Sequence, residues 1–344
     1  FTTAPDFESP EDSNSDNIYQ LSIQVSDGEA NATLNVSVSV QDKYEPSKEN
    51  HTVDLNASVG LEMIWVEPGT FMMGSPTTEA GRDENETQHE VTLTKGFYLG
   101  KYEVTQAQYE AVMTGNTHGL SATPSQFGGN PDRPVEKVSW NDAQVFLTRL
   151  NEQQSENLPN GWAYVLPTEG QWEYACRAGT TTAYSWGDSI SASDANWNHG
   201  SDANQTENVG HYSANMWGFF DMHGNVREWT ADAWGSYATG AQTDPFNVGT
   251  AGSRLVIRGG SWPNTGTKLR SASRFNFSPG SRSYSIGFRL TFREIPNSAP
   301  TELNATSSLA FNENLPISSV ITEFNASDPD GDSLAYSLVD GNGS

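Results

Sequence analysis

The stretch 257–289 gathers more side chains suited to ligand binding than any other part of the sequence. It holds Gly259-Gly260 beside an arginine, then Ser261-Trp262, and ends in Gly287-Phe288-Arg289. The paired glycines allow backbone conformations or close approaches that a side chain would forbid. The stretch contains no cysteine, histidine or acidic residue. It therefore offers hydrogen-bond donors and an indole, but not the thiolate and imidazole ligands of transition metals.

Within this stretch, aromatic faces alternate with hydrogen-bond donors, a composition suited to recognition of a glycan or a protein. The alternative is that the arginines pair with the many acids elsewhere in the chain. The predicted ligand-binding residues are Ser261, Trp262, Asn264, Arg270, Arg274, Asn276, Arg282 and Tyr284.

The composition of the chain restricts the kinds of partner that it can bind. The chain has 344 residues and a formal net charge of -25, from 18 Lys and Arg against 43 Asp and Glu. Such acidity argues against nucleic acid or an anionic membrane as partner. It is explained either by solubility in a salty medium or by Ca²⁺ sites, because Ca²⁺ prefers carboxylate and carbonyl oxygens.

The single cysteine, Cys176, excludes a disulfide or a Cys-Cys metal site within the chain. No apolar run is long enough for membrane insertion.

Three segments carry the signal of a capping box, at 105–108, 139–142 and 168–171. Each is followed by apolar residues at helical spacing, so we expect three helices that start there. Cys176 lies on the apolar face of the third, where we expect a small buried hydrophobe and not a nucleophile.

The two ends of the chain differ from the middle. Residues 1–46 contain an alternating hairpin pattern, 19–25 and 33–40, after an acidic stretch, and resemble the C-terminal part of a cadherin-like repeat. Residues 297–344 resemble the N-terminal part of such a repeat, and this resemblance implies calcium at Asp328, Asp330 and Asp332. The polar segment 47–59 is predicted to be a linker. We expect the chain to be a piece of a longer extracellular or cell-surface protein whose neighbouring parts are further cadherin-like repeats.

Residues 60–294 resemble the formylglycine-generating enzyme, or sulfatase-modifying factor, family. The resemblance implies an α+β fold of the C-type-lectin-like kind with much irregular loop. The motifs that carry it are PGTFMMGS at 68–75, KYEVT at 101–105, PVEKVSW at 134–140, LPTEGQWEYA at 166–175, DMHGNVREW at 221–229, RGGSW at 258–262 and IGFR at 286–289.

The resemblance also implies metal sites. The family binds Ca²⁺ through the segment that matches Asp221, Gly224, Val226 and Glu228 here. A second family site would begin at the match to Asn196-Trp197, with further ligands from 202–208. Arg227 departs from the pattern, since the family usually has an aromatic residue there.

The family's copper chemistry does not match this sequence. Formylglycine-generating enzymes hold Cu(I) with two cysteines shortly after Gly-Gly-Ser, and these positions are Asn264 and Leu269 here. Neither can bind Cu(I), which requires soft thiolates, so copper is not expected.

Two functions follow. The first is a non-catalytic, calcium-binding domain of an extracellular, adhesin-like protein that recognises a glycan or protein ligand. The same framework, RGGSW to GFR, resembles the ligand-binding end of lectin-fold variable proteins. The alternative is an oxidase that converts a substrate cysteine to formylglycine. A third hypothesis is that the domain serves only as a structural spacer.

Overall fold

The computed structural model describes residues 18–26, 31–39, 49–200, 204–295, 301–305 and 324–327. The chain divides into two units, Phe1–Arg293 and Glu294–Ser344. The first contains every helix of the described residues together with most of the strands, so the predicted α+β class is confirmed. Within the described ranges, no helix is both long and apolar enough to cross a bilayer.

The largest sheet brings together strands from both ends of the domain. Its order is β3-β4-β7-β14-β8. The late strand β14 thus lies between β7 and β8, two strands that come earlier in the chain. The strands are β3 His51–Asn56, β4 Val59–Val66, β7 Phe97–Gly100, β8 Trp162–Val165 and β14 Thr291–Glu294.

The predicted linker 47–59 needs correction. Strand β3 lies inside it and pairs antiparallel with β4, for example Val53 with Leu61. Both of these side chains are buried in the main core. Val53 alternates with polar neighbours, so one apolar face was enough to form an edge strand within a segment that is polar on average. The folded domain therefore begins before residue 60.

Two smaller sheets carry the rest of the motifs. The four-stranded sheet β12-β11-β9-β13 contains the strand residues of the 257–289 stretch. The three-stranded sheet has the order β10-β6-β5. Their strands are β5 Gly69–Met73, β6 His89–Leu93, β9 Arg227–Ala233, β10 Gln242–Thr243, β11 Leu255–Arg258, β12 Arg274–Phe277 and β13 Ile286–Gly287.

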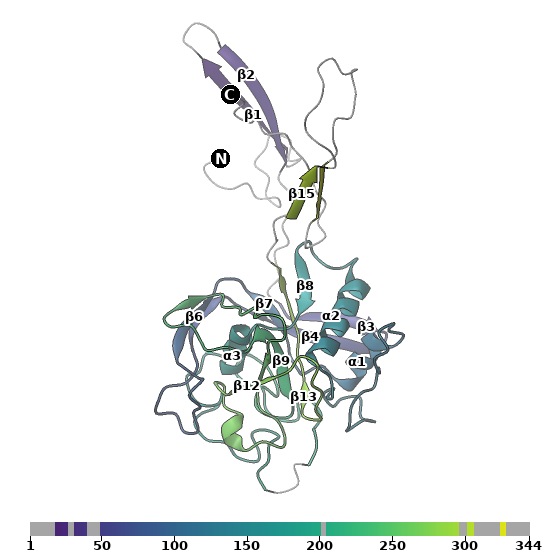
Figure 1. The fold of residues 1–344 in the computed structure, drawn as a ribbon, viewed down its shortest axis with the longest axis vertical. Helices are drawn as coiled ribbons and strands as arrows, with labels where there is room; N and C mark the ends of the chain where they lie inside the picture. The colour runs from purple at the N-terminus through teal and green to yellow at the C-terminus, as the bar shows by residue number, and fades with distance from the viewer. Residues whose placement is uncertain are drawn as a thin grey trace. The chain divides into compact units, whose positions relative to one another are not determined.

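All three predicted helices are present, with complete capping boxes. They are α1 Gln106–Met113, α2 Trp140–Gln154 and α3 Glu169–Arg177. Helices α1 and α2 pack on each other, whereas α3 packs against β5, β9 and β11 (Figure 1). Cys176 on α3 is fully buried among apolar side chains, as predicted.

The flanking segments form strand pairs of their own. Strands β1 (Ile18–Ser26) and β2 (Asn31–Ser39) make the predicted antiparallel hairpin. In the second unit, β15 (Thr301–Ala305) pairs antiparallel with β16 (Phe324–Ser327). The predicted calcium ligands Asp328, Asp330 and Asp332 lie outside the described residues.

Candidate functional site

Four arginines of the 257–289 stretch are buried, and each is paired with a carboxylate from another part of the chain. All four are at most 2% exposed. A buried guanidinium is tolerated only when its charge and its N–H groups find partners. The pairs are Arg258 with Glu173, Arg270 with Glu79 and Glu86, Arg274 with Glu169, and Arg289 with Glu228.

The register of the four-stranded sheet explains this burial. Arg258 on β11 is the partner of Arg274 on β12 and of Glu228 on β9. Directly paired residues of antiparallel strands point to the same face of a sheet. Helix α3 contacts β9 and β11 and supplies Glu169 and Glu173. Burial opposes the charge of Arg258, but the carboxylates of Glu173 and Glu169 outweigh it and raise the pKa of Arg258.

The structure therefore removes three residues from the predicted ligand surface. Arg270 donates to Glu79 at 2.6 Å and to Glu86 at 2.8 Å. Arg274 donates to both carboxylate oxygens of Glu169 at 2.7 Å. Ser261 is fully buried. These side chains are engaged in the interior, so pairing with acids, the alternative left open by the sequence, holds for both arginines.

Two residues of the stretch, Trp262 and Tyr284, form an aromatic cluster with Phe127 from another loop, and we call this cluster the aromatic face. The ring of Trp262 lies 5.6 Å from that of Tyr284 and 5.7 Å, edge-on, from that of Phe127. The indole N–H of Trp262 donates to the Tyr284 carbonyl at 3.4 Å. Tyr284 is 48% exposed, whereas Trp262 is half-buried. The structure thus brings together two of the predicted ligand-binding residues and adds Phe127, which the sequence did not indicate.

Two further predicted residues lie on the outside but are already engaged. Arg282 donates to both oxygens of Asp142, at 2.6 and 2.7 Å, and its side chain is 50% exposed. The carbonyl of Asn276 accepts from Arg254 at 3.0 Å, and its side-chain oxygen also contacts that guanidinium. Asn276 lies on β12. These contacts order the two polar side chains before any ligand arrives.

Arg227 is bonded through its backbone to the chain beside the aromatic face. Its guanidinium lies 4.5 Å from the centroid of the Phe275 ring, and burial lowers the pKa of Arg227 to about 10. Its backbone N–H donates to Ser285, and that of Trp262 donates to Asn225, both at 2.9 Å. The segment 225–227 therefore fixes the chain on either side of the two exposed rings.

The family's copper positions have no copper ligand in this structure. Asn264 accepts a hydrogen bond from the Ser261 hydroxyl at 2.9 Å. Leu269 is fully buried in an apolar cluster. Cys176 is buried too, which raises the pKa of its thiol to about 12, and its sulfur lies 3.6 Å from His223 Nε2. An amide, an isobutyl group and a neutral thiol do not fit Cu(I), so no chemistry through copper follows for this chain.

The predicted calcium segment lies in an acidic part of the interior. Glu103, which the sequence did not single out, accepts from the Asn225 amide at 2.6 Å and from the Val226 N–H at 2.9 Å. Burial, and then the charges of Asp221 and Glu228, raise the pKa of Glu103 well above its usual range. Burial likewise raises the pKa of Asp221 to about 6. Three carboxyl groups are thus close enough to perturb one another.

Part of this segment is already occupied by protein groups. Both oxygens of Glu228 accept from Arg289, at 2.6 and 2.8 Å, and one also accepts from the Trp172 indole at 2.7 Å. Asp221 accepts from the Gly210 N–H at 2.7 Å. Among the residues that the structure describes, no three His, Cys, Asp or Glu side chains are grouped so that they could hold a metal. A calcium ion here would therefore depend on the backbone carbonyls of Gly224 and Val226 as well.

The second predicted calcium segment touches the first. The Asn196 carbonyl accepts from the Asn225 N–H at 3.0 Å. A Cβ at Gly224, whose φ is +106°, would come within 2.4 Å of that carbonyl, so only glycine allows the approach. The indole N–H of Trp197 donates to Ser191 at 3.0 Å. Of the segment 202–208, from which further ligands were expected, residues 202 and 203 lie outside the described residues.

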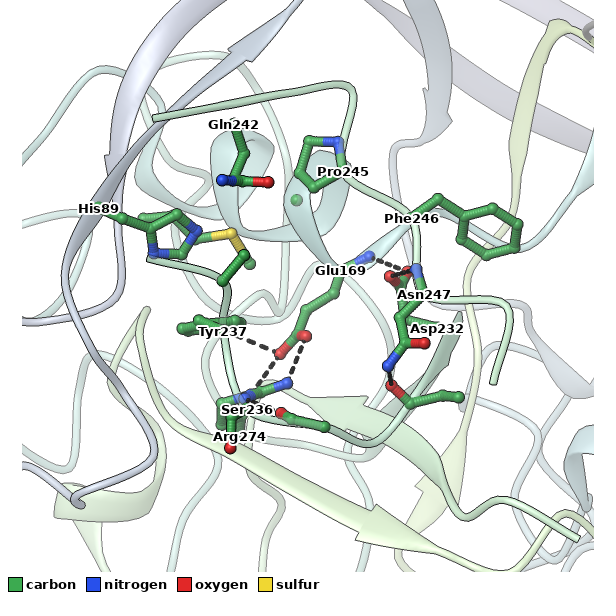
Figure 2. A pocket seen from close by; sticks show the side chains of 15 residues that line it. His89, Glu169, Asp232, Ser236, Tyr237, Gln242, Pro245, Phe246, Asn247 and Arg274 are labelled. Atoms are coloured by element: carbon green, nitrogen blue, oxygen red, sulfur yellow. Dashed lines mark hydrogen bonds and ion pairs between the residues drawn. The ribbon is translucent and has the colours of Figure 1, made fainter. Parts of the chain in front are cut away.

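A cavity of about 380 Å³ opens near the start of α3. Figure 2 shows Glu169 and Arg274 on its floor, with His89 and Gln242 on one side and Asp232 and Asn247 on the other. Its residues come from five separate parts of the chain, near 73, 89, 169, 232–247 and 274, which is why no sequence pattern indicated it. They include Met73, His89, Glu169, Asp232, Tyr237, Gln242, Phe246, Asn247 and Arg274.

The acids of this cavity hold the fold together. Asp232 accepts from the backbone N–H groups of Glu169 at 2.7 Å and Asn247 at 2.9 Å. Burial, and then the charge of Glu169, raise the pKa of Asp232 to about 7. Glu169 also accepts from the Tyr237 hydroxyl at 3.1 Å. These bonds join α3, β9 and the 237–247 loop, so the cavity is a consequence of how that loop is anchored.

The fold and these motifs define a domain of the class that the sequence suggested. Residues 50–294 match the family described as sulfatase-modifying factor enzyme 1-like domain. This is well over half of the chain, which therefore belongs to that family.

Named relatives have different architectures. The chain is 25% identical over 297 residues to mouse formylglycine-generating enzyme, which covers 68% of this chain and 76% of the enzyme. It is 31% identical over 250 residues to the serine/threonine-protein kinase pkn1 of Chlamydia caviae, covering 66% of this chain but only 37% of the kinase. Among solved structures, Treponema denticola variable protein 1 matches with a TM-score of 0.59 and 26% identity, over 72% of this chain and 99% of that protein.

Proposed function

We propose that this domain is a non-catalytic member of its family that recognises a glycan or protein ligand through the aromatic face. The proposal rests mainly on which residues occupy positions 264 and 269. An asparagine already bonded to Ser261 and a fully buried leucine stand where the oxidases hold copper. The family framework is retained, yet its two copper-binding cysteines are replaced.

The shape of the aromatic face supports recognition. Trp262 and Tyr284 are rigid, amphipathic side chains, and Trp, Tyr and Arg are the residues that contribute most to binding at interfaces. The half-exposed Arg282 lies two residues from Tyr284 and is held by Asp142. The solved relative with a matching fold carries the name variable protein 1.

The alternative function, formylglycine generation, has a direct test. The 344-residue chain would be incubated with Cu(I), oxygen and a Cys-x-Pro-x-Arg peptide, and aldehyde would be captured with a hydrazide. Mouse formylglycine-generating enzyme is the positive control. We expect no aldehyde above that of a reaction without protein. Aldehyde that increases with the amount of this chain would overturn the non-catalytic proposal.

Ligand recognition is tested by binding to a glycan array and to cells that have been treated with protease or glycosidase. Loss of cell binding after only one treatment distinguishes a protein from a glycan ligand. We expect Trp262→Ala or Tyr284→Ala to weaken binding about tenfold or more, the usual effect of removing a central aromatic residue. Phe246→Ala, which removes an equally exposed ring beside the 380 Å³ cavity, is the matched control. Unchanged binding by both variants would contradict ligand recognition through the aromatic face.

We also propose that the domain binds Ca²⁺ at the segment 221–228. Three interacting carboxyl groups, Glu103, Asp221 and Glu228, face one guanidinium, that of Arg289, so a divalent cation would offset an excess of negative charge. Because Arg289 occupies Glu228, Asp221 should carry most of the effect. Calcium at 100 times its Kd should stabilise the chain by about 2.7 kcal/mol.

The calcium test compares thermal unfolding in EDTA, CaCl₂ and MgCl₂. We expect Asp221→Ala to abolish the calcium-specific rise in the midpoint for the domain, while Asp132→Ala, at an exposed acid, retains it. A variant in which Asp328, Asp330 and Asp332 are each replaced by Asn distinguishes calcium bound by the C-terminal flanking segment from calcium bound by the domain. A midpoint that does not respond to calcium in the unaltered chain contradicts the site.

The wider context that we propose is an extracellular, adhesin-like protein with cadherin-like repeats on both sides of the domain. The acidic segments at both ends and the strand pairs β1-β2 and β15-β16 support this proposal. Antibody labelling of intact cells of the source organism, compared with permeabilised cells, tests it. Labelling that requires permeabilisation would exclude a cell-surface location.

A further inference from the structure

An open groove, whose lining shares no residue with the aromatic face, includes Trp186, which packs against the buried His223. It encloses about 820 Å³, within the approximate 300–1,000 Å³ range of small-ligand sites. Three segments of irregular chain form it, 179–187, 193–194 and 213–216. Its lining includes Thr181, Trp186, Ser193, Asp194, Ser213 and Met216.

Trp186 is held rigidly at this groove. One face of its indole stacks on Tyr184, with ring centroids 5.3 Å apart and planes only 6° from parallel. Its edge meets the His223 ring at 4.7 Å and 71°. Its N–H donates to the Ser189 carbonyl at 2.9 Å. With one face covered and its polar group satisfied, the remaining surface of the ring, 40% of the residue, is turned outward.

The groups behind Trp186 are themselves fixed. The Tyr184 hydroxyl donates to the Gly266 carbonyl at 2.9 Å. His223 donates through Nδ1 to the Leu269 carbonyl at 2.7 Å and accepts the Ser185 N–H through Nε2 at 3.2 Å. The aromatic platform is therefore pre-organised, and a ligand that stacks on it does not have to order it.

The polar groups of the groove offer acceptors rather than charged donors. One oxygen of Asp194 accepts from the backbone and the hydroxyl of Ser191, at 2.6 and 2.7 Å, which fixes the carboxylate. The hydroxyl of Thr182 donates to the Tyr184 carbonyl at 2.7 Å, so its own lone pairs remain available to a ligand. Of the described residues that line the groove, none is Lys, Arg or His. Acidic ligands are therefore disfavoured, and ligands rich in hydroxyl donors are favoured.

We propose that this groove binds a neutral oligosaccharide. The apolar C–H face of one pyranose ring would stack on Trp186, whose π-face is electron-rich, and its hydroxyls would donate to Asp194 and to the Thr and Ser oxygens. The site is separate from the aromatic face and does not depend on the function proposed for that face.

The test is to titrate the full chain with maltotriose, cellotriose, laminaritriose and chitotriose. Binding is measured by ligand-observed NMR and by tryptophan fluorescence. We expect at least one of them to bind with a Kd on the order of 1 mM. Trp186→Ala should weaken this binding at least tenfold, Asp194→Asn several-fold, and Trp186→Phe less than Trp186→Ala because a ring remains. Trigalacturonate, an acidic trisaccharide, should bind more weakly than the best neutral probe.

Trp262→Ala is the control that separates this site from the aromatic face. Binding of the neutral trisaccharide that survives Trp262→Ala but not Trp186→Ala supports the groove. No binding of any of the four probes, or binding that Trp186→Ala leaves unchanged, overturns the proposal. Binding abolished by Trp262→Ala alone would assign the sugar to the aromatic face. Thermal unfolding of Trp186→Phe, which preserves stacking on Tyr184, shows whether lost binding reflects lost folding.

Discussion

The 257–289 stretch has an inside and an outside that use the same residue types differently. Inside, Arg258 and Arg274 are fully enclosed, and the carboxylates of Glu173 and Glu169 compensate their charges. Outside, Arg282 forms an equally short bidentate pair with Asp142 but remains half exposed. Geometry alone does not distinguish these pairs. Desolvation does, because a buried charge that loses its partner cannot turn to water.

The largest effect should follow from removing a carboxylate on the inside. Glu173 is fully buried and pairs with both Arg258 and Arg177. Glu173→Gln would remove the carboxylate that pairs with the buried Arg177 and would leave Arg258 with the more distant Glu169, at 3.8 Å, so we expect a loss of about 3–5 kcal/mol in the free energy of unfolding by urea. Glu62→Gln, which removes the exposed partner of Lys101, is the matched control and should cost at most about 1 kcal/mol. Equal losses in the two variants would mean that burial does not set the cost.

A buried acid whose pKa is raised should show the opposite behaviour. Glu136 is fully buried, and one of its carboxyl oxygens has no hydrogen-bond partner. Burial raises the pKa of Glu136 from 4.5 to about 7. The folded chain thus keeps a proton that the unfolded chain has released, so stability falls as pH rises from about 4.5 to about 7 and changes little above that.

Glu136→Gln should remove this dependence, because the amide does not ionise. Between pH 5 and pH 8, we expect the unaltered chain to lose about 1–3 kcal/mol more stability than the variant. The measurement is urea unfolding at both values of pH. Asp232, whose pKa is also raised to about 7, is present in both chains and cancels in the difference. Parallel pH profiles would show that Glu136 is ionised in the folded chain at both values.

The sequence predicted local structure better than it predicted which side chains of the 257–289 stretch are buried and which are exposed. The capping boxes at Thr105, Ser139 and Thr168 rest on contacts three residues apart, so they could be found without the fold. The partners of the buried arginines lie far away in the chain, as with Arg270 and Glu86. No pattern in 257–289 shows which arginine meets which acid.

The pairing register of the strands is the information that the sequence alone did not provide. In β11 and β12, Arg258 and Arg274 share one face of the sheet, and α3 covers it with acids. The sequence showed a polar run there, which normally indicates a solvated loop. Phe127 of the aromatic face was missed for the same reason, because it reaches Trp262 from a distant loop. Long-range pairing, and not composition, determines which of these side chains a ligand can touch.

The smallest effect should come from the outside pair. Arg282→Ala removes an ion pair whose arginine is half exposed, and the buried Asp142 still accepts from the Ser139 N–H at the start of α2. We expect a loss of at most about 1 kcal/mol, reduced further by added salt. Arg274→Ala, at a buried arginine, is the matched variant and should cost about 3 kcal/mol or more. If Arg282→Ala proved as costly as Arg274→Ala, the outer pair would be part of the structural core, and the aromatic face next to it would be less free to bind a ligand than we propose.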